Sequence, residues 1–219
     1  MHKILSIGKY SSLVAAVAGA VYGLLQIFFG LHMLPHPENL YWFFAPSLLL
    51  AVVFLVTSVC LDIVAPQRVR PWTISAWALA TINCTVIFMI FCYQPGIMNP
   101  AHFDPETGDM GLNLFQLHTT LMAVKYAGFF LTGTSTFLLA FAFRNQQSTW
   151  LFRSLLLNVI LLPLLLVCKF YPNYYLLTSA FTITFPLATF HLSKYFATQE
   201  KKLQKKEKKI LKPLNWVID

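Results

Sequence analysis

The sequence has few charged residues, and acidic side chains are the scarcest of them. Charged residues make up 11% of the 219 positions, with 8 acidic against 16 basic side chains, whereas hydrophobic residues make up 57%. Soluble domains carry about 25% charged residues, and a chain of this length cannot hide so much apolar surface from water. The composition therefore excludes an ordinary soluble domain and indicates that a bilayer is the solvent for most of the chain.

The motifs of several enzyme classes are also absent. The sequence contains no HExxH, no P-loop, no GxGxxG and no spacing typical of a Ser-His-Asp triad, and its four cysteines form no CxxC pair. We therefore predict no catalytic residue, no metal site and no cofactor, and the pattern favours a protein that is not an enzyme. The net charge of +8 is crowded near the C-terminus, so it does not indicate nucleic-acid binding.

What the sequence does contain is a series of long apolar runs. A helix needs about 20 residues to cross the hydrocarbon core of a bilayer, and continuous runs of this length favour helices over membrane β-strands. We predict an all-α polytopic membrane protein, a bundle of six transmembrane helices within residues 1–198. The expected spans are about 10–34, 43–65, 72–93, 114–143, 150–171 and 174–196.

Basic residues predict the orientation of these spans. Lys3, Lys9, Arg68, Arg70, Arg144, Arg153 and Lys194 all fall on one side of a six-span protein. The other side has Lys169 alone among basic residues, together with several acids. Because loops rich in lysine and arginine stay in the cytoplasm, both termini are predicted to be cytoplasmic. We expect an integral, multi-pass membrane protein, and the sequence does not indicate which membrane holds it.

Residues 199–219 are predicted to form a cytoplasmic polybasic tail. Seven lysines and two glutamates lie between Gln199 and Lys212, and Phe196, Leu203 and Ile210 recur every seven residues. This spacing indicates a helix that extends the last span and binds anionic lipid headgroups. The alternative is a frayed tail that only enforces the orientation.

Two features of the spans have alternative interpretations. Ala15, Gly19 and Gly23 follow one another at four-residue spacing, which allows close helix packing, within this bundle or between two copies. Packing within the bundle is the favoured interpretation. Asp62 lies one turn inside the second span and is interpreted as an ion-pair partner of Arg68 or Arg70 rather than as a proton carrier.

The candidate ligand site lies in the fourth span. His118, Lys125 and Thr132 share one helix face with Met122, Phe129 and Thr136. A face with a lysine, a histidine and hydroxyls is expected to turn into the bundle, where it would line a vestibule open to the outside. Lys125 would then offer its charge to an anionic ligand or headgroup. The alternative is that Lys125 snorkels to the outer headgroups.

Three functions remain open on the sequence alone. The first, slightly favoured, is small-ligand binding or transport through that outward-facing vestibule. The second is a non-catalytic accessory or scaffold subunit that contacts another membrane protein. The third is an intramembrane enzyme that acts on lipid or quinone through His118 and Lys125.

Overall fold

The computed structural model describes residues 1–30, 40–97, 110–144, 149–170 and 180–211. Within these ranges the side chains at 26, 29–30, 40–44, 90, 92–97, 110–126, 160–170, 182 and 209–211 lie outside the description. The described chain is all-helical, without strands. The α-helices are α1 (His2–Gly30), α2 (Leu40–Val64), α3 (Arg70–Ile97), α4 (Met110–Phe143), α5 (Thr149–Phe170) and α6 (Phe181–Leu211), and a 3-10 helix, η1 (Gln67–Val69), joins α2 to α3.

Three stretches of the described chain are long and apolar enough to cross a membrane. They are His2–Leu25, Ala45–Val64 and Gln67–Met89, and α4 adds a shorter apolar segment, Ala127–Phe143. In hydrocarbon every backbone N–H and C=O must be satisfied inside the protein, which a continuous helix achieves by itself. The helical fold and its membrane character therefore follow from the apolar runs of the sequence.

The helices extend beyond several of the predicted spans. α1 already begins at His2, and α3 continues through Gln94 and Pro95 to Ile97, where the sequence had indicated a loop. α6 continues without a break to Leu211. Pro95 was expected to lie beyond the end of this helix, but α3 continues through it. A proline near the end of a helix removes a single hydrogen bond, which the helix tolerates.

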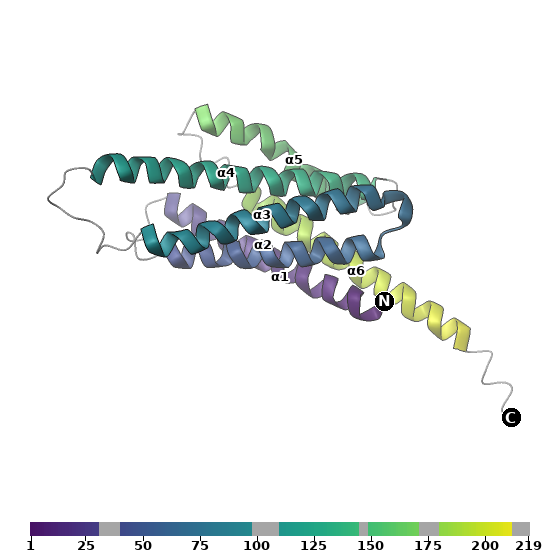
Figure 1. Ribbon diagram of the computed structural model, residues 1–219. Helices are drawn as coiled ribbons and strands as arrows, with labels where there is room; N and C mark the ends of the chain where they lie inside the picture. Colours follow the sequence, from purple (N-terminus) through teal and green to yellow (C-terminus); the bar gives the residue numbers. More distant parts are fainter. Residues whose placement is uncertain (31–39, 98–109, 145–148, 171–179, 212–219) are drawn as a thin grey trace, which may run out of the picture.

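The helices run side by side (Figure 1), and the contacts between them close into a ring in chain order. Each helix packs against the next along the chain, and α6 packs back against α1. The α1–α6 contact is the most extensive of all, followed by that between α1 and α2. The ring therefore depends most on the contact between its first and last helices.

Two glycines of α1 make this contact close. A Cβ at Gly8 would lie 2.5 Å from two ring atoms of Phe196, and a Cβ at Gly19 would lie 3.2 Å from Cγ of Pro186. Ala15 and Gly23, on the same stripe as Gly19, are buried as well. The small residues of α1 thus pack within the bundle, as the favoured interpretation predicted.

Apolar side chains cover the outside of the described bundle as well as filling its core. Apolar side chains such as Val17, Val56 and Ile183 are exposed, whereas the buried polar residues are all Ser, Thr or Asn. Many of these buried hydroxyls donate to the carbonyl one turn earlier, as Ser58 does to Phe54 at 2.9 Å. Such a surface is unstable in water but suits a bilayer, where lipid covers the apolar exterior.

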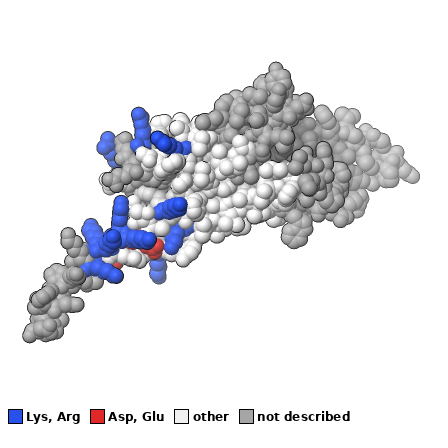
Figure 2. Space-filling view, turned by 180° about the vertical axis from the view of Figure 1, so that it is seen from behind, with Lys and Arg blue, Asp and Glu red and all other residues white. Residues whose placement is uncertain are grey.

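Charged side chains gather at one end of the bundle (Figure 2). This end contains the start of α1, the α2–α3 turn, the ends of α4 and α6 and the start of α5 (Figure 1). The white surface between this basic end and the grey atoms in Figure 2 shows no lysine, arginine or acidic residue.

Candidate functional site

Polar contacts connect neighbouring helices around the ring. In each contact a hydroxyl or a side-chain amide donates a hydrogen bond. The acceptor is a hydroxyl, an amide oxygen, a backbone carbonyl or the carboxylate of Asp62. The contacts are Ser11–Thr57, Thr73–Asp62, Asn83–Thr132, Ser135 with the carbonyl of Ala76, Thr184–Asn158 and Ser193 with the carbonyl of Lys9. In a membrane interior such hydrogen bonds contribute about 0.6 kcal/mol each on average.

Thr132, one of the three predicted ligand-binding residues, takes part in the contact between α3 and α4. Its hydroxyl donates to the carbonyl of Gly128 at 2.9 Å and accepts from Nδ2 of Asn83 at 3.0 Å. Thr132 is 8% exposed and Asn83 is 3% exposed. Thr132 is therefore occupied by a helix–helix contact in this state of the protein.

The side-chain amide oxygen of Asn83, Oδ1, is buried without a hydrogen-bond partner. It lies against Gly128 of α4, whose added Cβ would come within 3.2 Å of it. A buried acceptor without a donor is costly, at about 1–3 kcal/mol. Asn83 is thus the weakest point of the polar contact that joins α3 to α4.

The other two predicted site residues, Lys125 and His118, belong to α4, but their side chains lie outside the described residues. Three residues of the same predicted stripe are described. Phe129, Thr132 and Thr136 are all buried in the bundle. The described half of this helix face therefore points to the interior of the ring.

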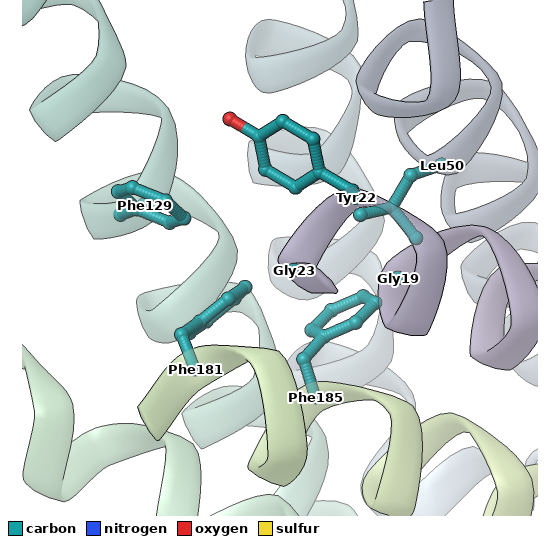
Figure 3. Close-up of a pocket in the computed structure, with 7 residues that line it drawn as sticks. All are labelled: Gly19, Tyr22, Gly23, Leu50, Phe129, Phe181 and Phe185. Carbon is teal, nitrogen blue, oxygen red and sulfur yellow. The ribbon is translucent and has the colours of Figure 1, made fainter. Parts of the chain in front are cut away.

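A small cavity lies inside the ring, where α1, α2, α4 and α6 meet (Figure 3). Its walls are Gly19, Tyr22, Gly23, Leu50, Phe129, Phe181 and Phe185. Figure 3 shows that the Tyr22 ring reaches from α1 towards α4 while Phe181 and Phe185 project from α6. The free volume of about 10 Å³ is close to that of one water molecule.

Aromatic contacts connect the walls of this cavity across the ring. Phe129 meets Phe181 edge to face with centroids 5.1 Å apart, and Phe181 stacks on Phe185 at 5.2 Å. Phe185 in turn meets Phe54 of α2 at 5.2 Å. This row of four rings links α4, α6 and α2, and three of the four rings line the cavity.

Towards the basic end the interior is filled. Leu61, Leu139, Leu151, Leu192 and Phe196 belong to one buried apolar cluster, and each is 1% exposed or less. Within the described residues, this half of the interior is therefore closely packed.

Asp62 forms the contact that the sequence indicated. Its Oδ1 accepts a hydrogen bond from the hydroxyl of Thr73 at 2.7 Å and lies 3.9 Å from Nε of Arg70. The carboxyl is 12% exposed and Arg70 is 55% exposed. Asp62 therefore holds the α2–α3 turn, and the predicted ion pair is confirmed for Arg70.

The described side chains include no cluster of three metal-binding residues. Comparison of the chain with protein-family models, with curated proteins and with solved structures finds no match. Function must therefore be inferred from the geometry of this chain alone.

Sequence reasoning missed two parts of this region. The contact of Asn83 with Thr132 was not predicted, although a lone amide within an apolar run indicates a helix–helix contact. The row of phenylalanines could not be recognised among 20 phenylalanines in the chain, because only the fold brings these four together.

Proposed function

We propose that this chain is a six-span membrane protein with both termini in the cytoplasm. The apolar exterior of the bundle supports membrane insertion, and the closed ring of six helices supports insertion of all six as a unit. The collection of lysines and arginines at one end supports an orientation with that end in the cytoplasm.

We further propose that the bundle binds a small ligand that enters from the end opposite the basic one. The observation that carries this proposal is the aromatic cavity, which lies beyond the closely packed basic half and has two glycines of α1 in its wall. Because the described interior towards the basic end is closely packed, we favour binding over transport in this state.

Position along α4 links the cavity to the predicted site. At 3.6 residues per turn, Lys125 falls one turn before Phe129, a wall of the cavity, and on the same helix face. His118 falls on this face two turns further from the basic end. We propose that the ligand combines an aromatic or apolar body for the cavity with an acidic group for Lys125.

The cavity must widen to admit such a ligand. Its present volume of about 10 Å³ holds no more than one water. The surrounding rings are the groups that must turn, because glycines offer no side chain to displace. Ligand binding is therefore expected to change the environment of Phe129 and Phe181.

Two probes of the same shape and opposite charge test this proposal. Thermal unfolding of the full chain in lipid nanodiscs would be measured with 4-phenylbutyrate and with 4-phenylbutylamine. A ligand at 100 times its dissociation constant stabilises the folded state by about 2.7 kcal/mol. We expect stabilisation by the carboxylate alone, its loss in Lys125→Met and its retention in Lys125→Arg.

Blocking the cavity provides the matched control. Gly23→Leu should abolish the effect of the carboxylate while the unliganded variant still folds, as checked by circular dichroism. Equal stabilisation by both probes, or full stabilisation of Lys125→Met, would contradict a site that uses Lys125.

A non-catalytic scaffold is the second candidate, and the tight closure of the ring favours it. Leu155 and Leu192 are fully buried, and the described interior leaves space for little more than one water. A scaffold would show no response to either probe, and a membrane protein partner would copurify with the chain. The partner would be lost on substitution of exposed outer residues and unaffected by Gly23→Leu.

A further inference from the structure

The last turns of α6 form a helix with two chemically distinct faces. Lys201, Lys202, Lys205, Lys206 and Lys208 are all exposed. Phe196, Glu200, Leu203 and Glu207 are spaced four, three and four residues apart, which puts them on one stripe of the helix. The lysines occupy the remaining circumference of the helix.

The stripe with the glutamates packs against the first turns of α1. Glu207 accepts a hydrogen bond from Nε2 of His2 at 2.9 Å, and Glu200 lies 3.9 Å from Nζ of Lys9. Between these ionic contacts, Leu203 packs against the apolar cluster that contains Leu5. α1 thus holds the end of α6 along three successive turns.

This arrangement places both glutamates of α6 on the stripe that faces α1, although the side chain of Glu207 is itself 53% exposed. Both glutamates face a cationic or hydrogen-bonding partner on α1, so neither is positioned to pair with the lysines across the helix. The exposed face therefore presents five described lysines with no acid among them. Its rotation is fixed because Leu203 and the buried Phe196 anchor the opposite side.

The lysines also lie at one end of the bundle. Because His2 contacts Glu207, they stand beside the start of α1, at the end of the bundle where lysines and arginines gather (Figure 2). From Lys201 to Lys208 the helix rises about 10 Å at 1.5 Å per residue. The headgroup region of a bilayer is about 5–8 Å thick on each side, so a helical segment of this length is long enough to cross it.

We infer that the lysine face of α6, oriented by the start of α1, binds anionic phospholipid headgroups of the cytoplasmic leaflet. Charge complementarity and the place of the lysines at the basic end carry this inference, which also rests on α6 crossing the bilayer as proposed above. Surface lysines attract anionic lipid through the field of the leaflet, and the attraction falls off within a Debye length.

Spin-labelled lipids test the inference on the full chain. The protein would be reconstituted in phosphatidylcholine, and the association of spin-labelled phosphatidylglycerol would be compared with that of spin-labelled phosphatidylcholine. We expect a preference for the anionic lipid that declines with added salt. Replacement of all five lysines by glutamine should abolish the preference, whereas replacement by arginine should preserve it.

Milder variants keep the test valid if the fivefold glutamine variant fails to fold. Lys205→Gln should weaken anionic lipid association by up to about fivefold. His2→Ala should weaken it less, because it frees Glu207 to approach the lysines. The inference would be overturned if the preference for the anionic lipid were unchanged in Lys205→Gln and in the fivefold variant. It would also be overturned if the protein bound soluble polyglutamate but showed no preference between the lipids.

The inference and the six-span proposal can fail separately. Labelling of Lys205→Cys from the two sides of the membrane reports whether α6 places this residue in the cytoplasm. If labelling places it there and no anionic preference is found, the inference alone is refuted. If labelling places it outside, the proposed topology is wrong, and the inference fails with it.

Discussion

The α1–α6 contact closes the ring, and Gly8→Ala tests it with a single methyl group. A Cβ at this position would lie 2.5 Å from Cε1 and Cζ of Phe196 and 2.9 Å from Cδ1. Real Cβ atoms do not approach carbon so closely, and Phe196 is fully buried. Either the phenyl ring must leave its position or the two helices must separate.

Two opposing terms set the size of the effect. Alanine stabilises a helix over glycine by about 0.5–1 kcal/mol. Overpacking a buried site costs about 1–3 kcal/mol. The phenyl ring of Phe196 is fully buried, so it cannot move aside freely. We therefore expect Gly8→Ala to lower the free energy of unfolding by about 1–2 kcal/mol. Gly19→Ala should lower it less, since its closest contact would be 3.2 Å from Pro186.

Unfolding in mixed micelles with increasing denaturing detergent would measure these changes. Phe196→Leu provides the second variant of a double-mutant cycle. With the ring removed, Gly8→Ala should become neutral or stabilising. The close contact would be refuted if Gly8→Ala raised stability in the native background, or if its effect were the same with Phe196 and with leucine.

Two further contacts give asymmetric predictions in the same unfolding assay. Thr132→Val should cost about 1 kcal/mol because it leaves the Asn83 amide without any partner, whereas Asn83→Leu should cost less because it also removes the unpaired oxygen. Equal losses in the two variants would contradict this account. Asp62→Asn should cost less than about 1 kcal/mol, since Arg70 is mostly exposed. Asp62→Leu should cost more, because Thr73 then loses its side-chain acceptor.

The helical fold could be predicted from the sequence because bilayer thickness sets the length of an apolar run. Helix ends were less predictable, since polar residues at the membrane boundary continue a helix as readily as they end it. α6 illustrates this: its lysines are good helix formers, and contacts with His2 and Lys9 hold it in place. The close packing of the Ala15–Gly23 stripe of α1 within the bundle was anticipated from residue size alone.

The interior of the ring could not be predicted in the same way. A membrane span that is apolar nearly all round has no periodic signal that tells which face meets which neighbour. The meeting of Asn83 with Thr132, and of Phe129 with Phe181, depends on the order and tilt of the helices. Lys125 and His118 remain predictions, because only the described half of their helix face is known to be buried.

Sided cysteine labelling tests the central claim, a six-span bundle with both termini in the cytoplasm. In a variant without the native cysteines, single cysteines would replace Asp104, which lies outside the described residues, and Lys205 in α6. A membrane-impermeant maleimide applied from the non-cytoplasmic side should label position 104 in intact membranes and reach position 205 only after permeabilisation. Labelling of both positions from the same side would contradict the six-span topology.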